Sequence, residues 1–205
     1  MIAAPFTVGF DLDMTLIDSR PGVHAVMTEL SRETGVYIDA DAVVSRLGPP
    51  LDEELAYWFR PEEIPAVADR YRALYPGYAI KPTPAMPGAA ESFAAIRAVG
   101  GRVLVVTAKY APNAAQHLEH LDLAPDILVG WHWGPKKGEA LLEHGATVYV
   151  GDHIADIHGA RAAQAVAVAV ATGPVSAADL EAAGADVVLP DLLGFPAWLA
   201  GYLAA

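Results

Sequence analysis

Two carboxylates, Asp11 and Asp13, follow a short apolar run at residues 6–10, near the start of the chain. The run has the length and composition of a buried strand, so both acids are expected at its carboxyl end. Each carboxylate raises the pKa of the other unless a cation lies near them. This arrangement suits a Mg²⁺ site in which one carboxylate attacks and its neighbour moves a proton. For the pair alone, the alternative is a solvated acidic loop.

Two later apolar runs also end in polar residues. The β-branched run at residues 102–107 ends at Thr107, and the run at residues 147–150 is followed by Asp152, with Asp156 one helical turn later. In a parallel sheet, ligands bind at the carboxyl ends of the strands. The acids and the threonine are therefore expected at one edge of one sheet.

Composition narrows the classes of partner. The chain has 205 residues, 54% of them hydrophobic, so a well-packed α/β domain is expected. The formal net charge of −12 disfavours nucleic acid and anionic membranes as partners, but not a small anion held by local donors and a metal. The absence of cysteine excludes disulfides, thiolate catalysis and cysteine-ligated zinc.

The sequence carries no apparent targeting or membrane segment. Its first residues lack a basic region followed by a long apolar one, so no signal peptide is predicted. The most apolar later stretch, residues 162–175, is interrupted by Gln164 and is too short to cross a bilayer. We therefore predict a cytoplasmic protein.

From residue 88 onward, predicted strands and helices alternate. Strands are expected over residues 102–107, 126–130, 147–150, 165–171 and 187–189, and helices over residues 89–99, 111–121, 137–143, 154–163 and 195–203, with a further helix beginning near Ser176. This alternation implies a parallel sheet with helices on both faces. The predicted fold is α/β, a Rossmann-like parallel sheet flanked by helices, with an inserted α-helical segment.

The insertion lies between the first strand and the second. Helices are expected around residues 23–30, over 39–47 and 51–59, and around 64–74. Pro61 fits the first turn of the last of these helices, and a proline-rich linker follows. A segment that leaves the sheet at its active edge is expected to close over the site and exclude water. We predict a core of residues 1–18 and 84–205 and a helical cap of residues 19–83.

Four segments resemble the motifs of the haloacid dehalogenase-like (HAD) hydrolases, in the order found in that family. They are FDLDMTLIDS at residues 10–19, VVTAK at 105–109, Lys137, and VGDHIAD at 150–156. One such motif is weak evidence, whereas four in order are strong evidence. The resemblance covers nearly the whole chain. The helical insertion and its exit are similar to those of the phosphoglycolate phosphatase-like branch, which carries a small α-helical cap.

The resemblance implies a role for each acid. Asp11 would attack phosphorus and form an aspartyl-phosphate, and Asp13 would be the general acid and base. The backbone carbonyl of Asp13 would also bind the metal. Asp152 would hold Mg²⁺ together with Asp11, and Asp156 would support the metal through its waters. The cation would convert the repulsion between these acids and a phosphate dianion into attraction.

Three further residues would bind the phosphoryl group. The Thr107 hydroxyl and the Ala108 backbone N–H would donate to its oxygens, and Lys137 would neutralise their charge. Strand propensity alone also accounts for Thr107. Lys136 is the neighbouring candidate, but the family spacing favours Lys137. Lys136 is then expected in solvent, because adjacent helix residues face different ways.

Three positions depart from the family pattern without removing a catalytic group. His153 stands where Ser or Thr is usual, and its imidazole is able to donate a hydrogen bond instead. Gln164 stands where glycine is usual, and Ala108 stands in the middle of the second motif, where Asn or Ser is common. These departures bear on fine tuning and on placement in a subfamily.

Two sets of side chains are weaker candidates for contact with the substrate. Trp131, His132 and Trp133 follow a predicted strand and either line the entrance or pack at the end of the sheet. Three arginines of the insertion could meet a substrate anion, although solvation at the surface is favoured for any one of them. They are Arg46, Arg60 and Arg70.

The predicted function is hydrolysis of small phosphorylated metabolites, phosphoglycolate-like or sugar phosphates, by a Mg²⁺-dependent phosphatase acting as a monomer or homodimer. The dehalogenase reaction is disfavoured because that branch lacks the paired acid. A sugar phosphomutase is an alternative, although that branch often has a Ser-Arg pair where this chain has Pro50 and Leu51. A catalytically weak phosphate-binding regulatory protein is the other alternative.

Overall fold

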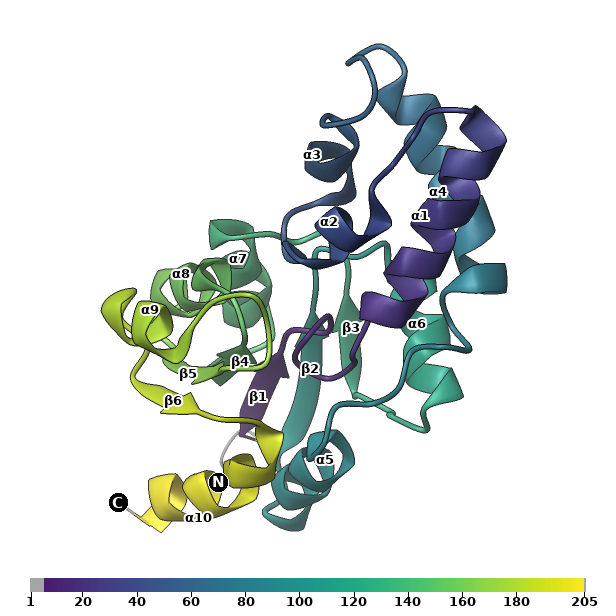
Figure 1. Cartoon of the computed structure of the whole chain (residues 1–205). Helices are drawn as coiled ribbons and strands as arrows, with labels where there is room; N and C mark the ends of the chain where they lie inside the picture. The colour runs from purple at the N-terminus through teal and green to yellow at the C-terminus, as the bar shows by residue number, and fades with distance from the viewer. Residues whose placement is uncertain (1–5, 205) are drawn as a thin grey trace.

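A six-stranded parallel sheet forms the centre of the molecule (Figure 1). The computed structural model describes residues 6–204. The strand order is β3-β2-β1-β4-β5-β6, so the first strand lies in the middle of the sheet. The strands are β1 (Thr7–Phe10), β2 (Arg102–Val106), β3 (Ile127–Val129), β4 (Ala146–Gly151), β5 (Val166–Val170) and β6 (Val187–Leu189). This arrangement confirms the predicted α/β class with a flanked parallel sheet.

Helices cover both faces of the sheet, and four more, α1–α4, form the insertion between β1 and α5 in the sequence. The helices are α1 (Arg20–Thr34), α2 (Ala40–Val44), α3 (Leu51–Leu55), α4 (Ile64–Tyr78), α5 (Ala89–Ala98), α6 (Ala111–His120), α7 (Pro135–Glu143), α8 (Ile154–Ala162), α9 (Ala177–Ala182) and α10 (Phe195–Ala204), with a 3₁₀ turn at Leu192–Gly194. Within residues 6–204, no helix is both long enough and apolar enough to cross a membrane.

Alternation along each strand separates two hydrophobic clusters. In β2, Val103 and Val105 belong to the cluster that includes residues of α5, α6 and α10. Leu104 and Val106 point the other way, into the cluster that includes residues of α7, α8 and α9. Because both faces are buried, the strands read as nearly continuous apolar runs in the sequence.

The helical insertion, residues 20–78, has a hydrophobic cluster of its own. Figure 1 shows α1–α4 grouped together at one end of the sheet, with α1 and α4 side by side. Apolar residues of α1 and α4 that recur at helical spacing are buried in this cluster, among them Val26, Leu30 and Leu74. The insertion therefore packs largely on itself.

Three details of the insertion differ from the sequence prediction. Helices α2 and α3 are shorter than expected and end at Val44 and Leu55, ahead of a turn in each case. Pro61 is not in the first turn of α4, because residues 60–63 form a separate turn in which the Glu63 carboxylate accepts a hydrogen bond from the Arg60 N–H. Pro65 occupies the first turn instead.

One buried hydrogen bond joins the insertion to the core. The Tyr75 hydroxyl on α4 and Nε2 of His117 on α6 lie 2.9 Å apart. Both side chains are fully buried. Burial lowers the pKa of His117 to about 4. The nearby Lys109 ammonium and His120 also lower this pKa, whereas Asp13 raises it. His117 is therefore neutral in the folded protein near pH 7.

Replacing Tyr75 by Phe should lower the free energy of unfolding by about 1–2 kcal/mol, because the buried imidazole loses its partner. Urea unfolding followed by circular dichroism measures this change. Tyr37→Phe is the matched control, since Tyr37 is 77% exposed. An unchanged unfolding midpoint for Tyr75→Phe would show that the bond contributes nothing.

Acidification should weaken the fold partly through His117. The unfolded chain protonates this residue near pH 6.5, whereas the folded chain does so only near pH 4. Stability is therefore lost as pH falls from about 6.5 towards 4. In His117→Gln, the loss between pH 7.5 and 4.5 should be smaller than in the wild type. His158→Gln, at an exposed position on α8, should keep the wild-type slope, and equal slopes in all three proteins would contradict the assignment.

Candidate active site

The neighbouring strands β1 and β4 bring Asp11 and Asp152 together. The Asp11 N–H donates a hydrogen bond to the Val150 carbonyl at 2.8 Å, which continues the pairing of β1 with β4 beyond the strand end. Asp152 follows Val150 by two residues. Asp11 is 7% exposed and Asp152 is 2% exposed. Residues far apart in the sequence thus meet at the carboxyl end of the sheet, as the sequence predicts.

Asp11, Asp152 and Asp156 form a buried acidic cluster. One oxygen of each carboxylate lies within 4.8 Å of the others. Burial raises the pKa of Asp11 to about 7, with Lys137 opposing this and Asp156 adding to it. Burial also raises the pKa of Asp152 well above its usual range, and Asp156 and Asp11 add to that shift. Such a set of hard oxygen donors fits a divalent cation, whose charge would favour the ionised acids.

Lys137, at the start of α7, supplies the positive charge inside this cluster. Its ammonium lies 2.9 Å from Oδ1 of Asp11 and 2.6 Å from Oδ1 of Asp156, and the residue is fully buried. Burial alone would lower the pKa of Lys137, but Asp11 and Asp156 raise it well above its usual value. Lys136 is exposed. The structure therefore places Lys137, and not Lys136, beside the predicted nucleophile.

Asp156 is held by both of its oxygens. Oδ1 contacts Lys137, and Oδ2 accepts a hydrogen bond from the His153 N–H at 3.0 Å. Nδ1 of His153 in turn accepts from the Ala155 N–H at 3.0 Å, so the two residues form a reciprocal cap at the start of α8. Nδ1 of the imidazole thus accepts a hydrogen bond, as a Ser or Thr hydroxyl does at such a position, and Nε2 is then the nitrogen that is able to donate.

The position of the Asp152 carboxylate depends on a hydrogen bond from Thr15 and on the absence of a side chain at Gly173. The Thr15 hydroxyl donates to Oδ1 of Asp152 at 2.9 Å. Gly173, in the loop after β5, lies so close that a Cβ at this position would overlap Oδ2 of Asp152. The carboxylate therefore depends on the absence of a side chain at residue 173.

A tight loop carries the chain from Asp11 to the insertion. The Leu12 carbonyl accepts from the N–H groups of residues 15, 16 and 17, at 3.3, 2.9 and 3.1 Å. Met14 has a left-handed backbone, with φ 59°, which is uncommon for a residue with a side chain. The Thr172 hydroxyl donates to the Met14 carbonyl at 2.5 Å and holds this turn in place. These hydrogen bonds thus hold the loop that carries Asp13, just after β1.

Asp13 lies outside the acidic cluster and pairs with Lys109. The Lys109 ammonium is 2.9 Å from Oδ1 of Asp13. Burial raises the pKa of Asp13, but the Lys109 ammonium, together with the nearby Ser19 hydroxyl, outweighs it, so the net shift is downward. The sequence analysis assigned no role to Lys109. Its position in the sequence could have indicated one, because Lys109 directly follows Thr107 and Ala108 at the end of a predicted strand.

The predicted phosphate-binding loop lies next to this pair. Thr107 is buried, and its hydroxyl oxygen accepts from the Lys109 N–H at 3.1 Å, which leaves the hydroxyl proton free to be donated. No residue among 6–204 accepts a hydrogen bond from the Ala108 N–H. Both groups are donors that an anion can use.

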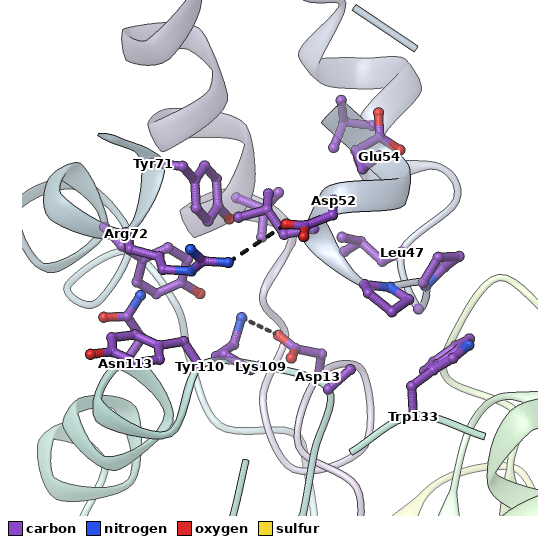
Figure 2. Close-up of a pocket in the computed structure, with 18 of the residues that line it drawn as sticks. Asp13, Leu47, Asp52, Glu54, Tyr71, Arg72, Lys109, Tyr110, Asn113 and Trp133 are labelled. Carbon is purple, nitrogen blue, oxygen red and sulfur yellow. Dashed lines mark ion pairs between the residues drawn. The ribbon is translucent and has the colours of Figure 1, made fainter. Parts of the chain in front are cut away.

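A cavity of about 460 Å³ opens beside Asp13, Ala108 and Lys109. Figure 2 shows its labelled residues, with the Lys109–Asp13 pair below and residues of the insertion above. Trp131 and Trp133 line it. His132 does not line it, and its N–H donates to the Thr107 carbonyl at 3.0 Å. The cavity is thus formed jointly by the insertion and by loops at the strand ends.

The insertion contributes two arginines to the cavity, and the sequence singled out one of them. Arg46 lines the cavity, whereas Arg60 pairs with Glu63 and Arg70 with Glu33 on exposed surfaces. Arg72 also lines the cavity and was missed. Arg72 follows Tyr71 on α4 and does not belong to the apolar face of that helix, so the hydrophobic pattern does not predict where its side chain points.

A sequence model of the family described as haloacid dehalogenase-like hydrolase matches residues 8–161. The chain belongs to this family. The matched region begins just before Asp11 and includes Thr107, Lys137, Asp152 and Asp156. Family membership therefore rests on the same segments that form the site.

Relatives support the same family. The chain is 25% identical to a phosphoglycolate phosphatase of Caulobacter vibrioides, over 93% of this chain and 89% of that protein. A HAD-like hydrolase of Streptococcus pneumoniae has a TM-score of 0.82 at 25% identity, with 95% and 98% of the two chains covered. A HAD hydrolase of Deinococcus radiodurans, solved with bound phosphate and sodium, has a TM-score of 0.69 at 25% identity, with 97% and 96% covered. These matches confirm the predicted family, fold class and enzyme class, a phosphatase.

Replacing Gly173 by Ala should displace the Asp152 carboxylate and weaken binding of a divalent cation by about 10- to 100-fold, the range typical of lost support for a metal ligand. Isothermal titration with Mg²⁺ measures this affinity. Gly77→Ala is the matched control, because nothing lies within 4 Å of a Cβ at that position on α4. Equal affinities in the two variants would contradict the role of Gly173.

Proposed function

We propose that this protein is a Mg²⁺-dependent phosphatase that hydrolyses small phosphorylated metabolites through an aspartyl-phosphate on Asp11. The observation that carries the proposal is the contact of Asp11 with the buried ammonium of Lys137, inside a cluster of acids at a strand end. A carboxylate held in this way is a nucleophile next to a cation that an incoming phosphoryl oxygen can also use.

The donor set supports a magnesium site. Asp11 and Asp152 would hold the ion with their carboxylates, together with the backbone carbonyl of Asp13. Asp156 would act indirectly, since both of its oxygens are already engaged by Lys137 and His153. When bound, Mg²⁺ supplies positive charge that reduces the repulsion between a phosphate dianion and these acids.

In the first half of the reaction, an Asp11 oxygen forms a bond to phosphorus, and the bond from phosphorus to the leaving oxygen breaks. The Thr107 hydroxyl, the Ala108 N–H and Lys137 stabilise the phosphoryl oxygens as charge develops on them. Asp13 gives a proton to the leaving oxygen, which departs as an alcohol. In the second half, Asp13 takes a proton from water, whose oxygen attacks phosphorus. The bond to Asp11 then breaks, and inorganic phosphate leaves.

Lys109 adjusts Asp13 for these two tasks. In the protein as described, its ammonium favours the ionised carboxylate, which is the form needed as a base. An incoming phosphoryl group offers Lys109 a second anion, and a weaker pair with Asp13 raises the pKa of that carboxyl. Substrate binding therefore shifts Asp13 towards its acid form.

We assign the two predicted parts of the chain to two tasks. Residues 1–18 and 84–205 hold the phosphoryl group, and residues 19–83 act as a cap over the leaving group. The lining of the cavity supports this division, because side chains of the insertion face the Asp13–Lys109 pair across it. A cap of this kind keeps bulk water from the aspartyl-phosphate.

Replacing Asp11 by Asn should lower phosphate release by about a thousandfold or more while the fold is kept, because an amide cannot form the acyl-phosphate. Release of inorganic phosphate from a panel of monoesters, with Mg²⁺ and with EDTA, measures this. Asp122→Asn is the matched control, at an exposed turn position whose left-handed backbone tolerates asparagine.

Wild-type rates in Asp11→Asn, or rates that survive EDTA, would refute the mechanism. Isomerisation of a sugar phosphate without release would point to a mutase. Binding without turnover across the panel would point to a regulatory protein.

A further inference from the structure

The cavity beside Asp13 has walls that are mostly hydrocarbon. Its volume, about 460 Å³, is within the range of about 300–1,000 Å³ typical of sites for drug-sized ligands. The insertion lines it with aliphatic side chains from α1, α2, α3 and the segment between α2 and α3. They are Val23, Met27, Val43, Leu47 and Leu51. Because Asp13 would act on the leaving oxygen, the remainder of the leaving alcohol must occupy this space.

The charged groups in the cavity wall compensate one another. Three cations line it, and each has a carboxylate partner that also lines it. Lys109 lies 2.9 Å from Asp13, and Arg72 lies 3.6 Å from Asp52 (Figure 2). The third pair, Arg46 with Glu54, is described next. The wall therefore offers no uncompensated positive charge to a second anionic group of a substrate.

Arg46 is the most firmly held of these cations. Its Nε and Nη2 donate to the two oxygens of Glu54, at 2.8 and 2.6 Å. Its guanidinium lies over the Tyr57 ring, 4.5 Å from the centroid. The indole N–H of Trp58 donates to the same Glu54 carboxylate at 2.9 Å. An anion could recruit Arg46 only by breaking a bidentate pair.

Arg72 is engaged in a similar way at the other side of the cavity. It pairs with Asp69 at 2.9 Å as well as with Asp52. Its guanidinium also lies over the Tyr110 and Trp131 rings, which stack on each other with centroids 5.1 Å apart. This arrangement presents flat ring surface and a satisfied cation.

We infer that the preferred substrates are phosphate monoesters of uncharged, largely apolar alcohols, of the size of a ring or a branched chain. This inference rests on the proposed phosphatase function and specifies its substrate class. Apolar carbon gains from burial against the aliphatic wall. A second negative charge would lose its water and find only paired cations. Monoesters that carry a carboxylate or a second phosphate should therefore be poor substrates.

A matched pair of esters tests the inference on the unaltered protein. Benzyl phosphate and 4-carboxybenzyl phosphate differ by one carboxylate, and their methylene group insulates the ester oxygen from the substituent. With Mg²⁺, kcat/KM should be at least about tenfold higher for benzyl phosphate, the factor expected for one unfavourable charge placement. It should also exceed kcat/KM for 2-phosphoglycolate, a small ester with a carboxylate.

A charge variant tests the cause of the preference. Glu54→Gln leaves Arg46 without its carboxylate partner, so the ratio of kcat/KM for the carboxylated ester to that for benzyl phosphate should rise about tenfold. Glu53→Gln removes the same charge from the same helix, α3, at an exposed position with no ion pair to Arg46. It should leave the ratio at the wild-type value.

Two kinds of result overturn these statements and are distinguishable. Faster turnover of either carboxylated ester by the wild type, or equal ratios in the two glutamate variants, overturns the inference while phosphate release still supports the phosphatase. No phosphate from any of the three esters, or release that survives both EDTA and Asp11→Asn, overturns the proposed function itself.

Discussion

A lysine ammonium without solvent exposure sits between carboxylates that follow two neighbouring strands. Lys137 contacts Asp11, at the end of β1, and Asp156, on the helix that follows β4. A buried charge of this kind is stable only when it is paired, and its partners are stable only when it is present. The pairing of β1 with β4 at the centre of the sheet makes this contact possible. The parallel strand order is therefore the condition on which the site depends.

Charge divides the space beside the sheet into two regions. Around Asp11, three carboxylates share one ammonium, so negative charge remains and a metal cation is favoured. Around the cavity under the insertion, acids and bases are matched in pairs. The Asp13–Lys109 pair stands at the boundary between them. One region is suited to a phosphoryl group with its metal, and the other to an alcohol without charge.

The strand ends could be predicted from the sequence because they depend on local pattern. Asp11, Thr107 and Asp152 each follow an apolar run, and parallel strands place such ends together. The pairs of Arg46 with Glu54 and Arg72 with Asp52 could not be predicted. They depend on how short helices turn against one another, and a hydrophobic pattern does not report the direction of a polar side chain at a helix edge. The pair of Lys109 with Asp13 could not be predicted either, because the two residues lie far apart in the sequence and no local pattern links them.

Two of the departures from the family pattern, His153 and Gln164, fall at positions where the backbone conformation matters more than contact with a ligand. His153 accepts the Ala155 N–H at the start of α8, so the helix keeps its cap and Asp156 keeps its place beside Lys137. Gln164 has φ 55°, a left-handed conformation that glycine adopts more easily, so its side chain costs about 1 kcal/mol of stability. Neither residue lies among the groups that would contact a phosphoryl group. A chain without catalytic activity would not need Asp11, Asp13 or Lys137, and here Asp13 is paired with Lys109 and Asp11 with the buried Lys137, which supports the proposed phosphatase over a regulatory protein without turnover.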